Sequence, residues 1–253
     1  MDYANSEYRT GLYKQYLEAV EIKNATCEYR LDKVIQYFNK KSGLKASPRI
    51  LDIGCSNGRF LEVAVRKGIE AWGLELSENA IAAASPHIRS RIYRGDANNI
   101  ESLELNKFNI VTAFDLIEHL FYPINFLKNL HKLITKDGII VMTTPDASSF
   151  LRIFMGKYWP MLQPFQHTIL LSRKAARLLL RETAYDQISI SGTKKVFTPD
   201  YLFRQLRGPT PPLFRAYDRI SRVVPGFIKE AKVQVDIGEM MISASPISNL
   251  SDQ

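Results

Sequence analysis

The sequence has few cysteines and no long apolar run. Cys27 and Cys55 are its two cysteines, too few for a disulfide framework, and free thiols suit a reducing compartment. No stretch approaches the roughly 18 consecutive apolar residues of a membrane-spanning helix. The opening residues, MDYANSEYRTG, lack the basic and then apolar regions of a secretion signal. We therefore expect a soluble, cytoplasmic protein.

Two common phosphate-binding motifs are also missing. A glycine pair, Gly54 and Gly58, follows the apolar segment RILDI, but its spacing matches neither the GxGxxG dinucleotide motif nor the GxxxxGK[ST] phosphate loop. No Lys-Ser/Thr pair follows Gly58. The turn is therefore not expected to hold a phosphate.

Charge is unevenly distributed along an otherwise ordinary globular composition. The 253 residues are 45% hydrophobic and 24% charged, with a net charge of +8. Residues 147–232 carry 15 basic and 5 acidic groups, a net charge of +10, whereas residues 1–146 have a net charge of +1. An acidic partner for the second half, such as a phosphate, a nucleic acid or an anionic lipid surface, would explain this excess. A solvated basic face would explain it equally well.

Apolar periodicity predicts alternating strands and helices. Residues 7–41 have helical spacing and predict two helices. Short apolar segments then alternate with amphipathic ones, which predicts a parallel sheet with helices on both faces. The expected strands span residues 49–53, 70–75, 90–94, 109–114 and 139–143, followed by 186–191 and 233–242.

Acidic residues close the first three of these strands. Asp52 precedes the glycine turn, Glu75 ends the next strand 23 residues later, and Asp96 follows the third. In an open α/β sheet the strand ends at the switch point form the ligand crevice. A helix N-terminus after the glycine turn would offer free N–H groups to a carboxylate. Glu75 is placed to accept hydrogen bonds from ribose hydroxyls, and Asp96 is placed to accept one from an adenine amino group.

The sequence resembles the class I S-adenosylmethionine-dependent methyltransferases. Over residues 48–146 five segments match in family order and spacing: LDIGCSNG, GLELS, GDANNI, FDLIEHL and DGIIVMTTP. The resemblance implies an α/β fold with a Rossmann-like seven-stranded sheet, helices on both faces and an antiparallel last strand. It also implies an acceptor-binding insertion.

The same resemblance implies S-adenosyl-L-methionine as the cofactor. The glycine turn would face its methionine part, Glu75 would hold the ribose, and Asp96 with the Ala97 amide would hold the adenine. Cys55 would serve as a small filler. The expected cofactor-binding residues are Asp52, Gly54, Cys55, Ser56, Gly58, Glu75, Leu76, Asp96, Ala97 and Asp115.

Three regions are expected. Residues 1–45 would form an N-terminal helical lid, and residues 46–146 the cofactor-binding core. Residues 147–253 would supply the acceptor-binding segment and the last strands of the same sheet.

Catalysis is expected to involve His119 and His167. Methyl transfer is largely a matter of alignment, but an oxygen acceptor must also lose its proton, which a histidine can accept. The spacing of Asp115, Glu118 and His119 resembles that of metal-assisted ubiquinone-pathway O-methyltransferases and small-RNA 2′-O-methyltransferases. In these a later histidine, here His167, completes the site. A bound Mg²⁺ would orient the acceptor hydroxyl and lower its pKa. Many relatives with this segment bind no metal, and packing or cofactor contacts are the alternative.

The acceptor is suggested only by the basic second half. Arginines alternate with apolar residues over 201–223, which predicts a basic amphipathic surface. Such a surface could contact an anionic membrane from its inner face, bind a phosphorylated or nucleotide-linked acceptor, or be solvated. The arginines are Arg204, Arg207, Arg215, Arg219 and Arg222.

We expect an O-methyltransferase acting on a small or lipid- or glycan-linked acceptor. A nucleic acid is disfavoured, because the sequence has no separate RNA-binding module and lacks the Asn/Asp-Pro-Pro-aromatic motif of amino-methylating enzymes. N-methylation of a small molecule or sugar is one alternative. A non-catalytic partner subunit that retains the fold is another, although the intact Gly54, Gly58, Glu75 and Asp96 argue against it.

Overall fold

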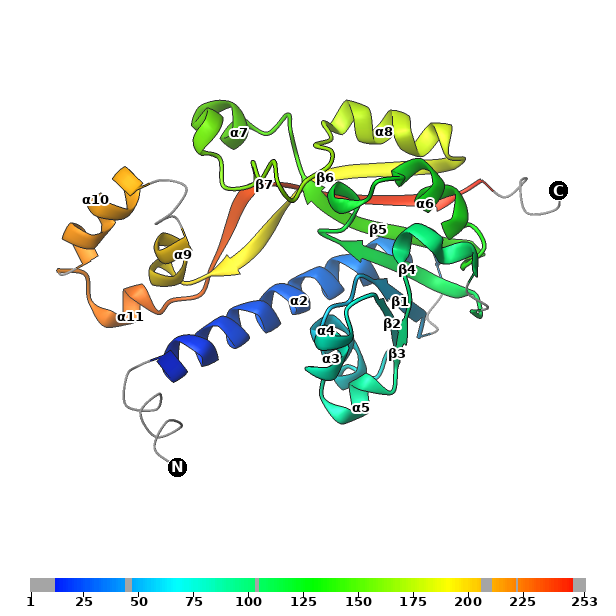
Figure 1. Cartoon of the computed structure of the whole chain (residues 1–253), viewed down its shortest axis with the longest axis horizontal. Coiled ribbons are helices and arrows are strands. Elements are labelled where there is room, and N and C mark those ends of the chain that lie inside the picture. Colours follow the sequence, from blue (N-terminus) through cyan, green and yellow to red (C-terminus); the bar gives the residue numbers. More distant parts are fainter. Residues whose placement is uncertain (1–11, 44–46, 103–104, 206–210, 222, 248–253) are drawn as a thin grey trace.

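The computed structural model describes residues 12–43, 47–102, 105–205, 211–221 and 223–247. Seven strands form one sheet in the order β3-β2-β1-β4-β5-β7-β6 (Figure 1). Five of them are parallel, and β7 runs antiparallel to both β5 and β6. The strands are β1 (Arg49–Ile53), β2 (Glu70–Glu75), β3 (Ile92–Arg94), β4 (Phe108–Phe114), β5 (Ile134–Pro145), β6 (Tyr185–Phe197) and β7 (Val233–Pro246).

The strand order reverses between β1 and β4. β1 pairs with β2 on one side and with β4 on the other. The loop that follows β1 and the loop that follows β4 therefore leave the carboxyl ends of these strands in opposite directions. Such a divergence opens a crevice in doubly wound sheets. The Rossmann-like sheet with its antiparallel last strand is confirmed.

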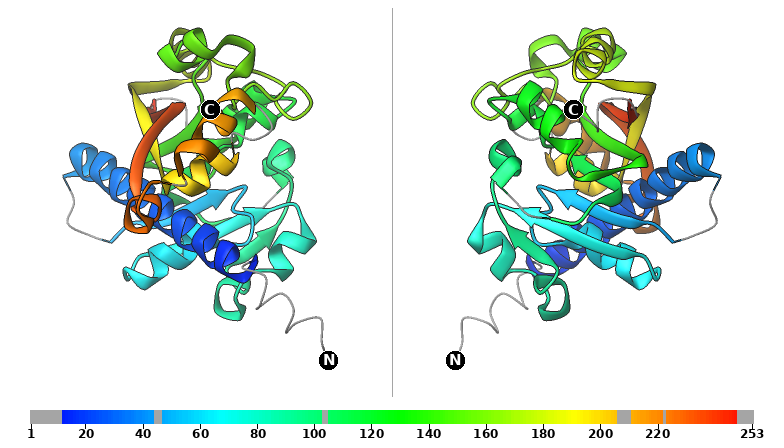
Figure 2. Two further views of the ribbon diagram at one scale, coloured as in Figure 1. Left: turned by 90° about the vertical axis from the view of Figure 1, so that its left-hand side faces the viewer. Right: turned by 90° about the vertical axis from the view of Figure 1, so that its right-hand side faces the viewer.

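Helices cover both faces of the sheet (Figure 2). They are α2 (Leu12–Ser42), α3 (Arg59–Arg66), α4 (Glu78–Ala82), α5 (Pro86–Arg89), α6 (Pro123–Leu130), α7 (Phe150–Met155), α8 (Arg173–Glu182), α9 (Pro199–Gln205), α10 (Pro211–Ser221) and α11 (Gly226–Lys229). Turns of 3₁₀ helix are η1 (Ala97–Ser102), η2 (Ile117–His119) and η3 (Gly156–Tyr158). Several helices begin at caps that the sequence supplies: Ser77 and Ser172 accept from backbone N–H groups, and Pro123 opens α6.

Two apolar clusters fill the space between the sheet and its helices. Successive strand residues point to opposite faces, so Ile50 joins one cluster and Leu51 the other. On one face α2 and α3 bury residues such as Leu31 and Leu61, and on the other α6 and α8 bury residues such as Phe126. The burial of apolar area on both faces holds the strand ends in fixed positions.

The prediction of two N-terminal helices is wrong. One continuous helix, α2, spans Leu12–Ser42, and residues 1–11 lie outside the described residues. No proline or glycine interrupts residues 12–42, and Ile22, Leu31 and Phe38 are all buried, so nothing breaks the helix. Among the described residues, no helix is both long and apolar enough to span a membrane.

Candidate active site

The glycine turn after β1 requires its glycines. Gly54 and Gly58 have φ of 74° and 71°, in the left-handed region where a side chain is costly. The Gly54 N–H donates to the Leu74 carbonyl at 2.8 Å, which anchors the turn to β2. A Cβ on Gly58 would collide with the Ile88 side chain. The turn therefore brings bare backbone to the crevice.

Glu75 ties the ends of β1 and β2 together. Its carboxylate accepts from the backbone N–H of Ser56 and from that of Ser77, each at 2.8 Å. Each carboxylate oxygen can accept more than one hydrogen bond, so Glu75 keeps acceptor capacity for a ligand hydroxyl. The side chain is held in place before any ligand arrives.

Asp52 is a buried acid beneath the glycine turn. Its side chain accepts from Thr112 Oγ1 on β4 at 2.7 Å, and the residue is only 4% exposed. Burial raises its pKa to about 7. Asp52 therefore fixes the crevice floor and is poorly placed to act as a free solvent-exposed carboxylate.

The remaining predicted cofactor-binding residues follow the ends of β2 and β3. Asp96 Oδ1 accepts from the backbone N–H of Asn98 at 2.8 Å, which closes the loop after β3. Ala97 begins η1 and packs against the core, whereas Leu76 is 59% exposed beyond β2. These residues lie in the order that the sequence predicts.

A cavity of about 400 Å³ opens beside the glycine turn. Of the residues predicted to bind the cofactor, Asp52, Gly54, Cys55, Ser56 and Asp115 line it, and the other five lie outside it. Its further walls come from α2, α3, β4, β6 and α9. They include Ile22, Lys23, Thr26, Cys27, Arg30, Arg59, Phe60, Phe114, Lys195, Phe197 and Tyr201.

Sequence reasoning missed a buried charge cluster on this cavity. Asp115 lies 2.8 Å from the Arg30 guanidinium and 3.2 Å from the Lys195 ammonium. Lys195 also donates to Glu239, which is 2% exposed. We call Arg30, Asp115, Lys195 and Glu239 the charge cluster; it joins α2, the end of β4, β6 and β7.

The cluster sets the ionisation of its own members. Burial alone would raise the pKa of Asp115, but the Arg30 and Lys195 cations hold that pKa well below its usual range. Burial would lower the pKa of Lys195, and the Asp115 and Glu239 carboxylates raise it instead. Burial and the Asp115 charge raise the pKa of Glu239. Lys195 is therefore a permanent cation at neutral pH.

Two signals in the sequence could have revealed this cluster. Arg30 interrupts the apolar stripe of α2 formed by Cys27, Leu31 and Val34, and Glu239 stands in an otherwise apolar stretch of β7. A charge on a buried face requires a partner. The partners lie far apart in the chain, so the sequence could not name them.

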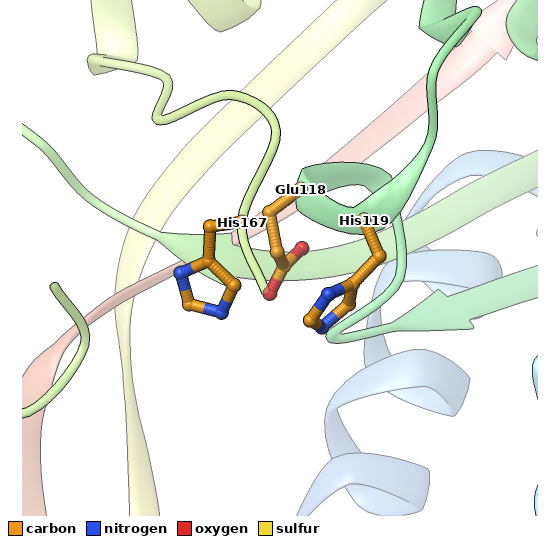
Figure 3. Close-up of side chains that lie close together, drawn as sticks. All are labelled: Glu118, His119 and His167. Atoms are coloured by element: carbon orange, nitrogen blue, oxygen red, sulfur yellow. The ribbon is translucent and has the colours of Figure 1, made fainter. Parts of the chain in front are cut away.

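The two predicted histidines lie side by side (Figure 3). The rings of His119 and His167 are 4.9 Å apart between centroids, with Glu118 between them. The Thr168 N–H donates to the Glu118 carbonyl at 2.7 Å, which fastens the His167 loop to η2. Neither histidine lines the cavity; Asp115 on the cavity wall lies two residues before η2, which carries His119.

One histidine is oriented for proton transfer. His119 Nδ1 lies 2.8 Å from the Gln166 carbonyl, which can only accept, so Nδ1 carries the hydrogen and Nε2 is a free acceptor in the neutral ring. His167 Nδ1 is buried without a hydrogen-bond partner among the described residues. Burial and the neighbouring His119 hold the pKa of His167 below its ordinary value. His167 is therefore neutral at pH 7, and His119 Nε2 faces no hydrogen-bond donor among the described residues.

The predicted metal ligands are only partly brought together. Ligand atoms of Glu118, His119 and His167 lie within 4.8 Å of one another, whereas Asp115 belongs to the charge cluster. Glu118 is 2% exposed, and burial raises its pKa to about 7. Mg²⁺ prefers oxygen ligands, whereas two imidazoles and one carboxylate are typical of zinc sites. The donor set fits magnesium poorly, and we assign it no step.

Comparison with known proteins identifies the family. A family model described as a methyltransferase domain matches residues 23–189, about two thirds of the chain. The chain belongs to this methyltransferase family. S-adenosylmethionine is the cofactor that the sequence resemblance implies for it.

Curated relatives match about half of the chain. The ubiquinone biosynthesis O-methyltransferase of Bradyrhizobium diazoefficiens is 30% identical over 142 residues, 53% of this chain and 53% of the relative. That of Pseudomonas aeruginosa is 24% identical over 125 residues, 47% of this chain and 53% of the relative. The methyltransferase thus spans about half the length of the curated relatives that it matches.

Solved structures share the whole fold at low identity. A SAM-dependent methyltransferase from Archaeoglobus fulgidus has a TM-score of 0.59 and 19% identity, covering 92% of this chain and 99% of that one. The plantazolicin methyltransferase BpumL, solved with S-adenosylhomocysteine, has a TM-score of 0.53 and 16% identity, covering 96% and 88%. These likenesses show the fold of the methyltransferase.

The residues in and beside the cavity suit the cofactor. Gly54 brings backbone without a side chain to the cavity wall, and Glu75, outside the cavity at the end of β2, retains acceptor capacity for ribose hydroxyls. The cavity wall carries both acids and bases, among them Asp52, Asp115 and Arg59, which match an amino acid moiety with charges of both signs. A volume of about 400 Å³ falls within the usual range of ligand sites.

Proposed function

We propose that this methyltransferase transfers a methyl group to a hydroxyl of a small or lipid- or glycan-linked acceptor. The observation that supports this most directly is the pair of His119 and His167 rings, with His119 four residues after Asp115 of the cavity wall and its Nε2 left as an acceptor. A hydroxyl acceptor needs a base, whereas an amine with a free lone pair does not. His119 is the base in this proposal, and the neutral His167 ring provides a polar surface beside the His119 ring.

The reaction is a direct displacement. S-adenosylmethionine supplies an electrophilic methyl group when bound. The acceptor oxygen forms its bond to that methyl carbon as the carbon–sulfur bond breaks, and the acceptor proton passes to His119 Nε2. Most of the acceleration comes from alignment, with the base adding about 10²–10⁴-fold.

We further propose a role for each of the three regions of the chain. Residues 1–45 act as a lid, which is supported by the five α2 residues on the cavity wall: Ile22, Lys23, Thr26, Cys27 and Arg30. The ten predicted cofactor-binding residues of the core hold the cofactor. Residues 147–253 bind the acceptor, which is supported by Lys195, Phe197 and Tyr201 on the opposite wall.

A labelled-methyl experiment tests the proposal. Purified enzyme is incubated with ¹³C-methyl S-adenosylmethionine and separate lipid and aqueous extracts of its source, with and without EDTA. An O–CH₃ carbon signal in a product supports the proposal, and an N–CH₃ signal contradicts it. His119→Asn should lower the rate about 10²–10⁴-fold, whereas His87→Asn, on exposed α5, should leave it unchanged. A rate indifferent to EDTA removes a metal at Glu118, His119 and His167.

Contact with an anionic membrane belongs to the same proposal. Phe150 and Phe154 on α7 are 80% and 78% exposed, with Arg152 between them and Lys157 next along the chain. On α11, Phe227 is 77% exposed and lies two residues before Lys229. Exposed aromatics next to basic residues suit the surface of an anionic bilayer. Arg207 and Arg222 of the predicted basic surface lie outside the described residues.

Vesicle sedimentation checks this contact. We expect more enzyme to sediment with phosphatidylcholine vesicles that contain phosphatidylglycerol than with pure phosphatidylcholine. The double change Phe150→Ser and Phe154→Ser should abolish the difference, whereas Leu178→Ser, equally apolar and 59% exposed on α8, should not. Equal sedimentation with both vesicles would reject the membrane contact.

A further inference from the structure

Lys195 is the cation of the charge cluster with a donor to spare. An ammonium has three N–H donors. Two are directed to the Glu239 carboxylate and the Asp115 carboxylate, 3.2 Å away. Its side chain is 21% exposed and lines the cofactor cavity, whereas Glu239 behind it is 2% exposed. The exposed part of the Lys195 side chain therefore faces the cavity.

The fold fixes this ammonium firmly. The register of β6 and β7 shifts between Thr193 and Lys195, opposite Gly238, whose φ is 83°. Such irregularities re-aim side chains beside active sites. The Trp159 indole donates to the Ile237 carbonyl at 3.0 Å, and a Cβ on Gly238 would press on that indole. Glu239 is thereby held inward, under Lys195.

The cavity beside Lys195 has aromatic walls. Phe197 and Tyr201 line it, with their ring centroids 6.2 Å apart, and Phe114 lines it under the Arg30 guanidinium. Flat apolar walls with one fixed cation suit an acceptor whose hydroxyl is attached to an aromatic or conjugated ring. Such a hydroxyl carries much of its charge as an oxyanion while it reacts.

We propose that Lys195 is a catalytic residue that donates its remaining N–H to the acceptor oxygen of a phenol-like acceptor. This inference rests on the proposed hydroxyl methylation. As the acceptor proton leaves for His119, negative charge grows on the oxygen, and a preorganised cation stabilises that charge in a partly dry site. Lys195 thus supplies, as a resident ammonium, the electrostatic assistance that a divalent metal would otherwise give.

A chromophoric phenol reports on this contact without turnover. 4-Nitrophenol turns yellow when it ionises, so its spectrum in the presence of enzyme and S-adenosylhomocysteine measures the pKa of the bound phenol. We expect wild-type enzyme to lower that pKa and Lys195→Met to abolish the shift. Lys195→Arg should retain part of it. Lys194→Met, which removes the exposed neighbouring lysine, should behave as wild type.

Kinetics separate this role from a structural one. With phenol, which is neutral at pH 7, Lys195→Met should lower kcat by about 10²–10³-fold, as the loss of one oxyanion donor does elsewhere. With 4-nitrophenol, about half of which is already ionised in solution near pH 7, less proton transfer is needed, so a larger part of the loss should fall on KM. Each variant must still bind S-adenosylhomocysteine in calorimetry, which shows that it has folded.

The outcomes distinguish the two proposals. An absent spectral shift with wild type, or a shift equal in Lys195→Met and Lys194→Met, overturns the role of Lys195 even if O-methylation is found. A Lys195-dependent shift together with methylation of amines alone overturns the hydroxyl proposal and leaves the phenolate contact standing. An unchanged kcat for phenol in a folded Lys195→Met enzyme also overturns the inference.

Discussion

Replacing Arg30 by methionine tests the buried charge cluster. Arg30 Nη2 lies 2.8 Å from Asp115, with side chains 11% and 33% exposed, and its guanidinium stacks 4.8 Å over Phe114. Removal of one partner of a buried pair leaves an uncompensated charge, which costs about 3–5 kcal/mol. Lys195 remains beside Asp115, so we expect the lower end, about 3 kcal/mol, in the free energy of unfolding.

A solvent-exposed ion pair supplies the matched control. Lys67 lies 2.7 Å from Asp32, but their side chains are 45% and 70% exposed. Exposed pairs contribute about 0–1 kcal/mol, so Lys67→Met should lower stability by no more than about 1 kcal/mol. Urea unfolding at pH 7 measures both variants. Similar losses in the two would refute the argument that burial makes the difference.

A double-mutant cycle assigns the loss to the pair. Asp115→Asn keeps a residue that tolerates the left-handed φ of 52°. With Asp115 neutral, Arg30→Met should cost about 2 kcal/mol less than in wild type, within the usual range of coupling energies. A coupling near zero would mean that Arg30 acts only through its packing on Phe114.

The pH dependence follows from the direction of the Asp115 pKa shift. The folded-state pKa lies below the unfolded value, so the stabilisation is fully present above an unfolded pKa of about 4. It is lost as pH falls through the folded pKa. The difference between wild type and Arg30→Met should therefore persist from neutral pH to about pH 5 and narrow only in stronger acid.

Three further changes test the cofactor site. Gly58→Ala adds a Cβ to a crowded left-handed position and should lower the free energy of unfolding in urea clearly more than Gly68→Ala does. Gly68 also has a left-handed φ, 76°, but no atom lies within 4 Å of its added Cβ. Equal losses in the two variants would contradict the steric argument. Glu75→Gln should weaken S-adenosylmethionine binding about 10–100-fold in calorimetry, since hydrogen bonds to charged groups contribute about 1.5–3 kcal/mol, whereas Glu78→Gln should not. Asp52 has its pKa raised from 3.8 to about 7, so the folded state binds its proton more tightly, and wild-type stability should fall as pH rises through that range. Asp52→Asn should flatten this slope, and an unchanged slope would show that Asp52 is ionised throughout.

Local signals in the sequence predicted the core of the fold. The alternation of apolar segments, the serine caps at Ser77 and Ser172 and the glycine pair each act over a few residues, so their consequences can be worked out without knowing the rest of the chain. The order of the strand ends then follows from the parallel sheet. This is why Asp52 and Glu75 lie where the sequence predicts.

Long-range pairing could not be predicted in the same way. Asp115 has the spacing of a metal ligand relative to Glu118 and His119, and nothing near it in the chain shows that Arg30, 85 residues earlier, reaches it first. The continuous α2 was missed for a related reason. Polar residues between Glu21 and Tyr29 interrupt the apolar stripe, but only tertiary packing shows that the helix passes through them unbroken.

The charge cluster bears directly on how an acceptor hydroxyl could be activated. Asp115 is held by two cations, so a divalent ion that recruited it would compete with Arg30 and Lys195 and would disrupt a buried ion pair. The Glu118, His119 and His167 set could still take an ion, but without Asp115, the second carboxylate that the sequence suggests. Assistance from Lys195 needs no exchangeable ion. A methyltransferase that is insensitive to EDTA but loses activity on Lys195→Met would therefore place its electrostatic catalysis in the charge cluster, and the reverse result would place it between the histidines.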